Sequence, residues 1–326
     1  MELSERSAER LDTVDLVGRV HSYAAASRAD STWKAYQSDL KHFAAWCAKH
    51  GIADPVPAEP RIVAAYLADY AGQLAVSTLA RRLYALSAIH RMGGHPIPTE
   101  APEVQSVWSG IKRTHRTAPR QKAPTRTKLI AKMLKPLSES PIDVRDRALL
   151  LIGFAGAFRR SELVALNVED ITDTEDGLHI AVRRSKSDQE GAGDIVGVPY
   201  GSNPATCPVR AWRAWLEVRR QVNEVADGPA FVSIPKGRKK KRISDNRLPA
   251  RVVATIVKRR VEAAGLDKDT FAAHSLRAGF ATEAFGHGVA ELSVMRHGRW
   301  KSSTSMRGYV REGSLWGDNA AAKLGL

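Results

Sequence analysis

The chain has 326 residues, 43% of them hydrophobic, which is enough for about two domains with buried cores. It has 50 lysines and arginines and 35 aspartates and glutamates, which leaves a net charge of +15. This charge favours nucleic acid as the partner, although an acidic protein partner, or a charge that serves only solubility, would also fit. There is no apolar run of about 18 residues and no signal-peptide core, and Cys47 and Cys207 stand in unrelated contexts, so we expect a cytoplasmic protein without a membrane span or a cysteine-held metal.

The N-terminal third of the chain is predicted to be helical. In STWKAYQSDLKHFAAWCAKHG, residues 31–51, the apolar side chains recur with the three-four spacing of a helix that buries one face. Glycines and prolines separate this stretch from the apolar stretches that follow, and no part of the region shows the alternation of a strand. Four helices are therefore expected, within residues 31–51, 61–74, 75–94 and 101–115.

A basic segment follows these helices. Residues 114–126, THRTAPRQKAPTR, contain two prolines and no large apolar side chain, which predicts an extended linker. Its cations Arg116, Arg120 and Lys122 are expected either to follow a phosphate backbone or to be ordinary solvated charges. The linker divides the chain into an N-terminal helical domain, residues 1–116, and a C-terminal domain, residues 127–326.

The C-terminal domain is predicted to combine helices with a small β-sheet, so the fold class is mainly α. Residues 143–166 predict a helix, a glycine-containing break and a second helix start. Residues 177–200 predict two strands around a glycine-rich turn. Residues 207–224 and 248–267 have the apolar stripe of amphipathic helices, and the strongly basic residues 237–247 form a loop between them.

Several residues of this domain suit the cleavage of a phosphodiester without a metal. Such a reaction needs arginines for the non-bridging oxygens, a nucleophile, and a general acid for the leaving oxygen. The sequence has no cluster of acidic residues typical of a metal-dependent nuclease. The candidates, in chain order, are Arg159, Glu162, Lys186, His274, Arg277, Trp300 and Tyr309.

Each candidate taken alone also has a structural interpretation. Arg159 could be a surface residue at a helix start, and the pair in HSLR could be a solvated helix face. Lys186 belongs to a loop rich in cations, and Trp300 could be a core residue. The catalytic interpretation depends on all of them occurring together and in order.

The ordered set resembles the active-site signature of the tyrosine recombinases, the phage integrase family. GAFRRSEL, residues 156–163, is similar to the pattern around the first arginine of the family, and HSLR resembles its H-x-x-R box. Nine residues lead from Trp300 to Tyr309, the spacing found in the family. The stretches TWKAYQSDLKHFAAWC and PAEPRIVAAYL resemble its DNA-binding helical domain. The sequence departs from the family at Ala278 and Trp300, where histidine is common, and in HGRW, where L-G-H is commoner.

The resemblance implies a two-domain, C-shaped clamp that recombines DNA at specific sites and is encoded by a bacterium, phage or plasmid. Tyr309 would attack a phosphate and form a 3′-phosphotyrosine, and strand exchange would pass through a Holliday junction without metal, cofactor or ATP. The partners would be two duplex sites with inverted repeats and three further copies of the chain. In isolation the chain would be a monomer or dimer.

The other six candidates take supporting roles by the same resemblance. Arg159 and Arg277 would bind the non-bridging oxygens, and His274 would assist proton transfer. Trp300 would donate its indole N–H to the phosphate, Lys186 would protonate the leaving 5′-oxygen, and Glu162 would support the cluster.

Further polar residues are predicted to contact DNA, although each could instead be only solvated. In the N-terminal domain they are Lys34, Lys41, Ser77, Thr78, Arg81 and Arg82. In the C-terminal domain they are Arg238, Lys239 and Lys240, expected on phosphates, and Arg247, Arg251, Lys258 and Arg259.

Two other functions remain open from the sequence. A topoisomerase of type IB would nick and rejoin one strand with the same chemistry, but the two-domain layout argues against it. A non-catalytic, sequence-specific DNA-binding protein of the same fold would be expected to have lost at least one residue of the catalytic set.

Overall fold

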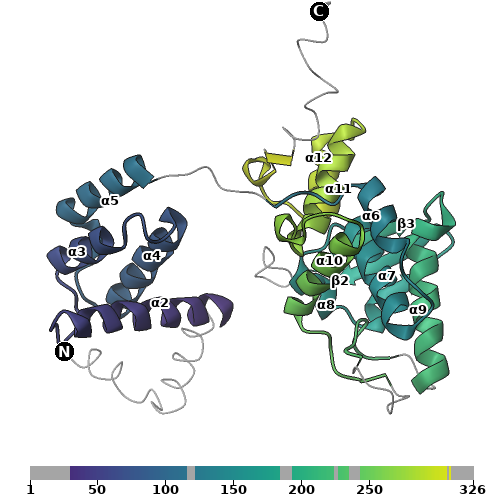
Figure 1. Cartoon of the computed structure of the whole chain (residues 1–326), viewed down its shortest axis with the longest axis horizontal. Coiled ribbons are helices and arrows are strands. Elements are labelled where there is room, and N and C mark those ends of the chain that lie inside the picture. The colour runs from purple at the N-terminus through teal and green to yellow at the C-terminus, as the bar shows by residue number, and fades with distance from the viewer. Residues whose placement is uncertain are drawn as a thin grey trace, which may run out of the picture. The chain divides into compact units, whose positions relative to one another are not determined.

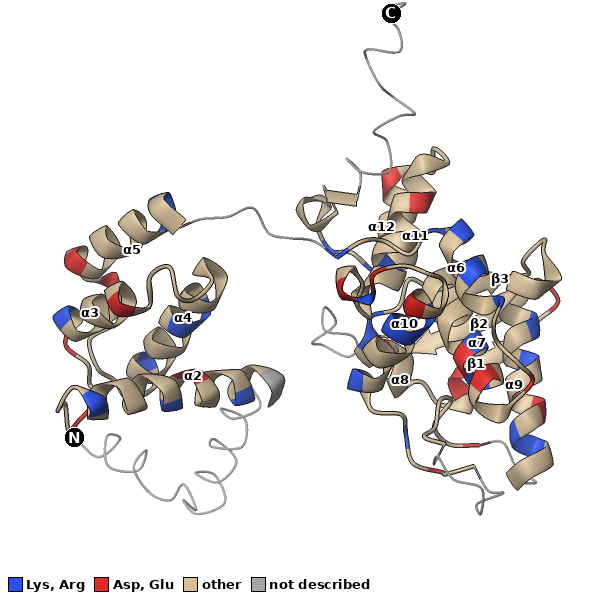
Figure 2. Ribbon diagram, viewed as in Figure 1, with Lys and Arg blue, Asp and Glu red and all other residues tan. Residues whose placement is uncertain are grey.

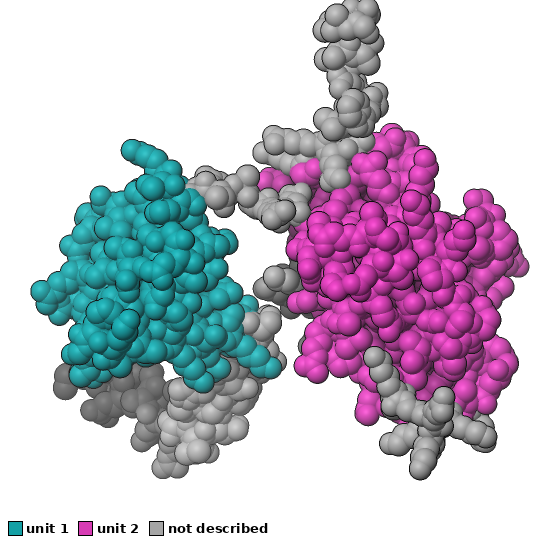
Figure 3. All heavy atoms as spheres, in the orientation of Figure 1, with its two compact units in different colours: residues 1–120 teal, residues 121–326 magenta. Residues whose placement is uncertain are grey.

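The computed structural model describes residues 30–115, 122–183, 193–223, 227–234, 243–306 and 308–309 (Figure 1). The chain forms two compact units, residues 1–120 and 121–326 (Figure 3). The prediction of a mainly helical protein with a small sheet in its C-terminal part is confirmed. In the part of the chain that is described, no helix is long and apolar enough to cross a membrane.

The first unit is a small helical bundle. It consists of α2 (Asp30–Lys49), α3 (Pro60–Tyr70), α4 (Val76–Met92) and α5 (Pro102–His115), with a 3-10 turn at Pro98–Glu100. Helix α2 packs against α4, and α3 packs against α5. The apolar faces meet in a core that contains Phe43, Trp46 and Tyr66, in which the Tyr66 ring contacts the rings of Phe43 and Trp46 edge-on.

The second unit contains the remaining helices. They are α6 (Thr127–Leu134), α7 (Pro141–Ala155), α8 (Arg160–Ala165), α9 (Pro208–Asn223), α10 (Ala250–Ala263), α11 (His274–Gly286) and α12 (Glu291–Gly298). Helix α7 is buried along most of its length, because it packs against both α9 and α11. This central helix ends at Ala155, directly before the turn that leads to Arg159.

A three-stranded antiparallel sheet lies between α8 and α9 in the chain. Its strands are β1 (Ile171–Asp173), β2 (Gly177–Val182) and β3 (Asp194–Pro199), in the order β1-β2-β3. Ile180 of β2 is opposite Ile171 and Val196 on its neighbours, and all three side chains face the core. The sequence predicted β2 and β3 but not the three-residue β1, which is too short to show an alternating pattern.

Helix α11 is held against the segment that enters the second unit. Thr125 donates to the carbonyl oxygen of Ser275 through its backbone N–H, at 3.0 Å, and through its hydroxyl, at 2.9 Å. Gly279 allows this contact, since a Cβ there would lie 2.1 Å from the Thr125 carbonyl oxygen. This packing fixes the start of the helix that carries His274 and Arg277.

Candidate active site

Arg159 and Glu162 are joined at the start of α8. Arg159 is the residue before the helix, and its backbone N–H donates to Glu162 Oε2 at 3.0 Å. The Arg159 guanidinium donates to Glu162 Oε1 at 2.5 Å. Burial alone would raise the pKa of the Glu162 carboxyl, but the hydrogen bonds from Arg159 and the charges of Arg299 and Arg159 outweigh it, so the pKa is lowered.

Arg277 is buried beneath this pair. Its Nη1 donates to the carbonyl oxygen of Ala157 at 2.6 Å, and its guanidinium lies 3.8 Å from the ring centroid of Trp300. Burial, followed by the charge of Arg159, lowers the pKa of Arg277 to about 9, so the side chain is still a cation at neutral pH. Its Nη2 is buried and has no partner among the described residues, so one strong donor remains for an anion.

His274 and Tyr309 form a hydrogen-bonded pair. The distance between His274 Nε2 and Tyr309 Oη is 2.7 Å. Although His274 keeps an exposed edge, the protein around its ring lowers its pKa by desolvation, and the charges of Arg277 and Arg159 lower it further. Burial raises the pKa of Tyr309, against the opposing effect of Arg277. At neutral pH the pair is therefore a neutral imidazole and a protonated phenol.

Trp300 packs beside the phenol. It is buried in a small apolar cluster with Val294 and Met306, and its ring centroid lies 6.2 Å from that of Tyr309. Gly298 makes room for the indole, since a Cβ on this glycine would lie only 1.6 Å from the ring. Trp300 thus contacts both Arg277 and Tyr309, as a residue of the core as well as of the site.

Arg299 belongs to the same cluster and was not predicted. The residue is 7% exposed, and its Nη2 lies 3.1 Å from Glu162 Oε2. Sequence reasoning missed it because an arginine in a polar, serine-rich run is typical of a solvated surface. The only signal was its place beside Trp300 in HGRW, where the sequence departs from the family pattern.

The assembled site is strongly positive. Arg159, Arg277 and Arg299 contribute three guanidinium groups and Glu162 one carboxylate, which leaves two net positive charges beside the Tyr309 hydroxyl. Such a cluster suits an anion with several oxygens. Among the described residues, no group of His, Cys, Asp and Glu side chains is placed to hold a metal ion. Lys186 lies outside the described residues.

The residues predicted to contact DNA differ in how exposed their side chains are. Lys34, Lys41 and Ser77 are exposed on α2 and α4, Thr78 is partly exposed, and Arg251 is exposed on α10. Lysines and arginines occur along each of these three helices (Figure 2). Arg116, Arg120, Arg238, Lys239 and Lys240 lie outside the described residues.

Four of the predicted cations are engaged by the second unit itself. Lys122 donates to the Asp269 carbonyl oxygen and Lys258 to its carboxylate, while Arg259 is paired with Asp146. Arg247 donates to the carbonyl oxygens of Val164 and Leu166. A DNA contact by any of these side chains would have to be added to, or replace, an existing bond.

Arg82 requires a correction, because it does not lie on the surface. The residue is 8% exposed, donates to the Tyr66 hydroxyl at 2.7 Å and lies 3.8 Å from the Asp39 carboxylate. Its neighbour Arg81 points outward and forms a bidentate pair with the same carboxylate, with both distances 2.8 Å. Consecutive residues of a helix point about 100° apart, so one arginine enters the core while the other remains half exposed.

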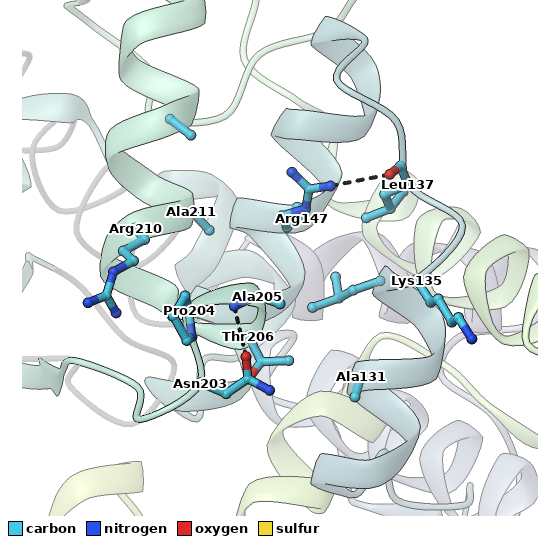
Figure 4. Close-up of a pocket in the computed structure, with 12 residues that line it drawn as sticks. Ala131, Lys135, Leu137, Arg147, Asn203, Pro204, Ala205, Thr206, Arg210 and Ala211 are labelled. Atoms are coloured by element: carbon cyan, nitrogen blue, oxygen red, sulfur yellow. Dashed lines mark hydrogen bonds between the residues drawn. The ribbon is translucent and has the colours of Figure 1, made fainter.

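An open pocket of about 560 Å³ lies elsewhere on the second unit (Figure 4). It is formed by α6, α7, the 3-10 turn at Pro204–Thr206 and the start of α9, and its apolar floor includes Leu134 and Ala211. Arg147 at its edge donates to the carbonyl oxygen of Leu137. None of the candidate catalytic residues lines it.

The chain is similar to known proteins along most of its length. Residues 125–314 match the phage integrase family, and residues 21–92 match the N-terminal SAM-like domain of phage integrases. An integrase/recombinase XerD homologue from Selenomonas ruminantium is 37% identical over 302 residues, which covers 91% of this chain and 86% of that protein. Recombinase Cre of Escherichia phage P1 is 27% identical, over 87% of this chain and 84% of that protein.

Solved structures show the same fold at lower identity. XerH site-specific recombinase bound to its palindromic difH substrate superimposes with a TM-score of 0.68 at 18% identity, covering 90% of this chain and 80% of that one. A lambda integrase dimer bound to a core site gives 0.59 at 16% identity, over 91% and 76% of the two chains.

Proposed function

Because the chain belongs to the phage integrase family and is a tyrosine recombinase, we propose that Tyr309 cleaves duplex DNA by attacking a backbone phosphate, forming a 3′-phosphotyrosine. The observation that carries this proposal is the 2.7 Å hydrogen bond between Tyr309 and His274, beside a cluster of buried arginines. A phenol in this position has both a proton acceptor and a cationic site for its target.

The proton of the phenol passes to His274. Tyr309 is protonated at neutral pH, because burial raises its pKa, and His274 is neutral, because desolvation and two arginines lower its pKa. Neutral Nε2 can therefore accept the proton as the Tyr309 oxygen bonds to phosphorus. The bond from phosphorus to the 5′-oxygen breaks, and that oxygen takes a proton. We assign this proton to Lys186 on the family resemblance.

Arg159 and Arg277 hold the non-bridging oxygens of the phosphate. The buried Nη2 of Arg277, which has no partner among the residues that the structure describes, supports this role, since such a donor is costly unless a ligand completes it. Trp300 lies against the Arg277 guanidinium and the Tyr309 ring, so it also fixes their separation. We assign its indole N–H to the phosphate, and to Glu162 the task of orienting Arg159.

The strands are rejoined by the reverse reaction. A 5′-hydroxyl attacks the phosphotyrosine, the bond to Tyr309 breaks, and the phenol recovers its proton. The phosphotyrosine keeps the energy of the phosphodiester bond, so neither ATP nor a cofactor is needed.

We propose that four copies exchange strands between two duplex sites with inverted repeats, through a Holliday junction, in the cytoplasm. A lambda integrase tetramer bound to a Holliday junction supports this assembly as a property of the fold family. The first unit and the basic face of α10 would grip the duplex around the phosphate that the site attacks.

The test uses a duplex that the protein binds specifically, beginning with inverted repeats next to its own gene. A nick close to the scissile phosphate lets the short 5′-hydroxyl fragment leave, so that the covalent complex accumulates. We expect a protein–DNA adduct on a denaturing gel, and its loss in Tyr309→Phe with DNA binding retained. If a specifically bound duplex yields no adduct with the unaltered protein, the proposal is wrong.

A second substrate separates recombination from simple relaxation. It carries two copies of the site with different flanks on one supercoiled circle. Exchange of the flanks supports the recombinase, whereas relaxation without exchange would identify a topoisomerase.

A further inference from the structure

Arg299 makes contacts that a surface arginine does not make. Its Nη2 donates to Glu162 Oε2 at 3.1 Å and to the carbonyl oxygen of Gly156 at 3.2 Å. Its Nη1 donates to the carbonyl oxygen of His297 at 3.0 Å, and the guanidinium lies 4.8 Å from the ring centroid of Phe158. The side chain therefore touches Glu162 and both ends of the 156–158 turn.

The backbone of Arg299 is in the left-handed region, with φ 59° and ψ 44°. It ends α12, a place where glycine is usual because a side chain is strained there. Ala157, in the turn that Arg299 contacts, also has a positive φ of 49°. Strained backbone of this kind is held in place by its surroundings and occurs often at functional sites.

Two connections lead from Arg299 to the phosphate-binding arginines. Glu162 accepts from Arg299 through Oε2 and from the Arg159 guanidinium through Oε1, so it is shared between the two cations. The 156–158 turn leads directly into Arg159, and its Ala157 carbonyl oxygen accepts from Arg277 at 2.6 Å. Both groups that orient Arg159 and Arg277 are thus in contact with Arg299.

We infer that Arg299 is a positioning residue for strand cleavage, which holds Glu162 and the 156–158 turn so that Arg159 and Arg277 face the scissile phosphate. The inference rests on the proposed function. The charge of Arg299 also offsets that of Glu162. Without it, Arg159 alone would neutralise Glu162, and the net charge of the cluster would fall from two positive charges to one.

The side chain can be removed without adding backbone strain. Glycine adopts a φ of 59° freely, so Arg299→Gly removes the guanidinium and keeps the end of α12. Arg299→Lys restores a charge but not the planar fork that reaches Glu162 and Gly156 together. Glu162→Gln removes the carboxylate through which Arg299 is connected to Arg159.

The experiment measures single-turnover formation of the covalent adduct on the nicked duplex, with saturating enzyme. We expect Arg299→Gly to lower the rate constant by about 10- to 100-fold, as small displacements of binding groups do, with little change in DNA affinity or in the reacting fraction. We expect Arg299→Lys to recover part of the rate. In the Glu162→Gln background, Arg299→Gly should lower the rate by a smaller factor than it does in the unaltered protein, because one of its two connections is already lost and coupled residues are not additive.

Arg219→Ala is the matched control for losing a buried arginine. Arg219 is 2% exposed and donates to the carbonyl oxygens of Pro229 and Asp227, away from the site. This change should lower thermal stability and leave the rate constant unaltered.

Four outcomes decide between the possibilities. A normal rate constant in Arg299→Gly overturns the inference, and so does an equal fold-loss with and without Glu162. A loss confined to the reacting fraction, shared with Arg219→Ala, would show that the role is only structural. Absence of an adduct with the unaltered protein would instead overturn the proposed function.

Discussion

At the scale of single residues, the site depends on neighbours that shift proton affinities in opposite directions. His274 is neutral because desolvation and nearby cations lower its pKa, whereas Tyr309 keeps its proton because burial raises its pKa. The two side chains are hydrogen bonded, so a single proton transfer would produce the proposed nucleophile. In the proposed reaction, the arginines that lower the pKa of His274 would also stabilise the charge that develops on the phosphate.

This arrangement predicts the pH dependence of cleavage. A histidine that accepts a proton must be neutral, and the pKa of His274 is lowered from 6.5. The rate of adduct formation should therefore stay constant on acidification through pH 6.5 and fall only below it. His274→Gln should remove this acid limb and lower the rate by about 10²- to 10⁴-fold. His287→Gln, at the exposed C-terminal end of the same helix, should leave the profile unchanged; an acid limb that persists without His274 would contradict its role as base.

The buried Arg82 of α4 is expected to contribute more to the free energy of unfolding than an exposed lysine does. Arg82→Ala leaves the Tyr66 hydroxyl and the Asp39 carboxylate without a buried cation, and should cost about 2–4 kcal/mol of the stability of the first unit. Lys34→Ala, on the exposed face of α2, should change stability by less than about 0.5 kcal/mol. Chemical denaturation followed by the fluorescence of the tryptophans tests the difference, and an equal effect of both changes would contradict the buried position of Arg82.

At the scale of elements, the position of α11 depends on one close backbone approach. His274 and Arg277 lie on the first turn of this helix, and Gly279 lets the helix touch the strand-like segment at Thr125. The contact joins residues 150 positions apart, as the hydrogen bond from Thr125 to Ser275 shows. The segment that enters the second unit and helix α11 therefore pack together and should lose their positions together.

Gly279→Ala should break this contact. The new Cβ would lie 2.1 Å from a backbone oxygen, which cannot move as a flexible side chain can. We expect a loss of about 2–4 kcal/mol in the free energy of unfolding and a weaker cleavage activity. Gly110→Ala in α5 is the matched control, since nothing lies within 4 Å of its Cβ, and it should stabilise the protein by up to about 1 kcal/mol. Thermal melts of both variants test the pair, and similar behaviour would contradict the packing.

At the scale of the whole molecule, the net charge of +15 governs binding to DNA. Each neutralised phosphate releases counterions, so the logarithm of the binding constant should fall steeply and linearly with the logarithm of salt concentration. Replacing Lys34 and Lys41 together by alanine should reduce this slope by about 1 to 2, if both contact phosphates. Fluorescence anisotropy at several salt concentrations measures the slope, and an unchanged slope would show that both lysines are only solvated.

Local patterns were sufficient for much of the fold and for the family. The helices of the first unit and α7, α9 and α10 of the second follow from the spacing of apolar residues, and β2 and β3 follow from alternation beside a glycine-rich turn. The resemblance to tyrosine recombinases rested on Arg159, HSLR and the nine-residue step to Tyr309, and the family assignment is confirmed. These features can be recognised in the sequence because each depends on residues that are close together in the chain.

Other features depend on which distant segments meet. β1 is a strand because β2 pairs with it, not because of its own three residues. Arg82 and Arg299 look like surface residues in the sequence, yet each is buried against a carboxylate, at Asp39 and at Glu162, the latter 137 residues away. The sequence by itself determined most of the elements, the family and the order of the candidate catalytic residues. Only the tertiary structure decided which charges are buried and paired, because burial and ion pairing are properties of the surrounding elements rather than of a residue's neighbours in the chain.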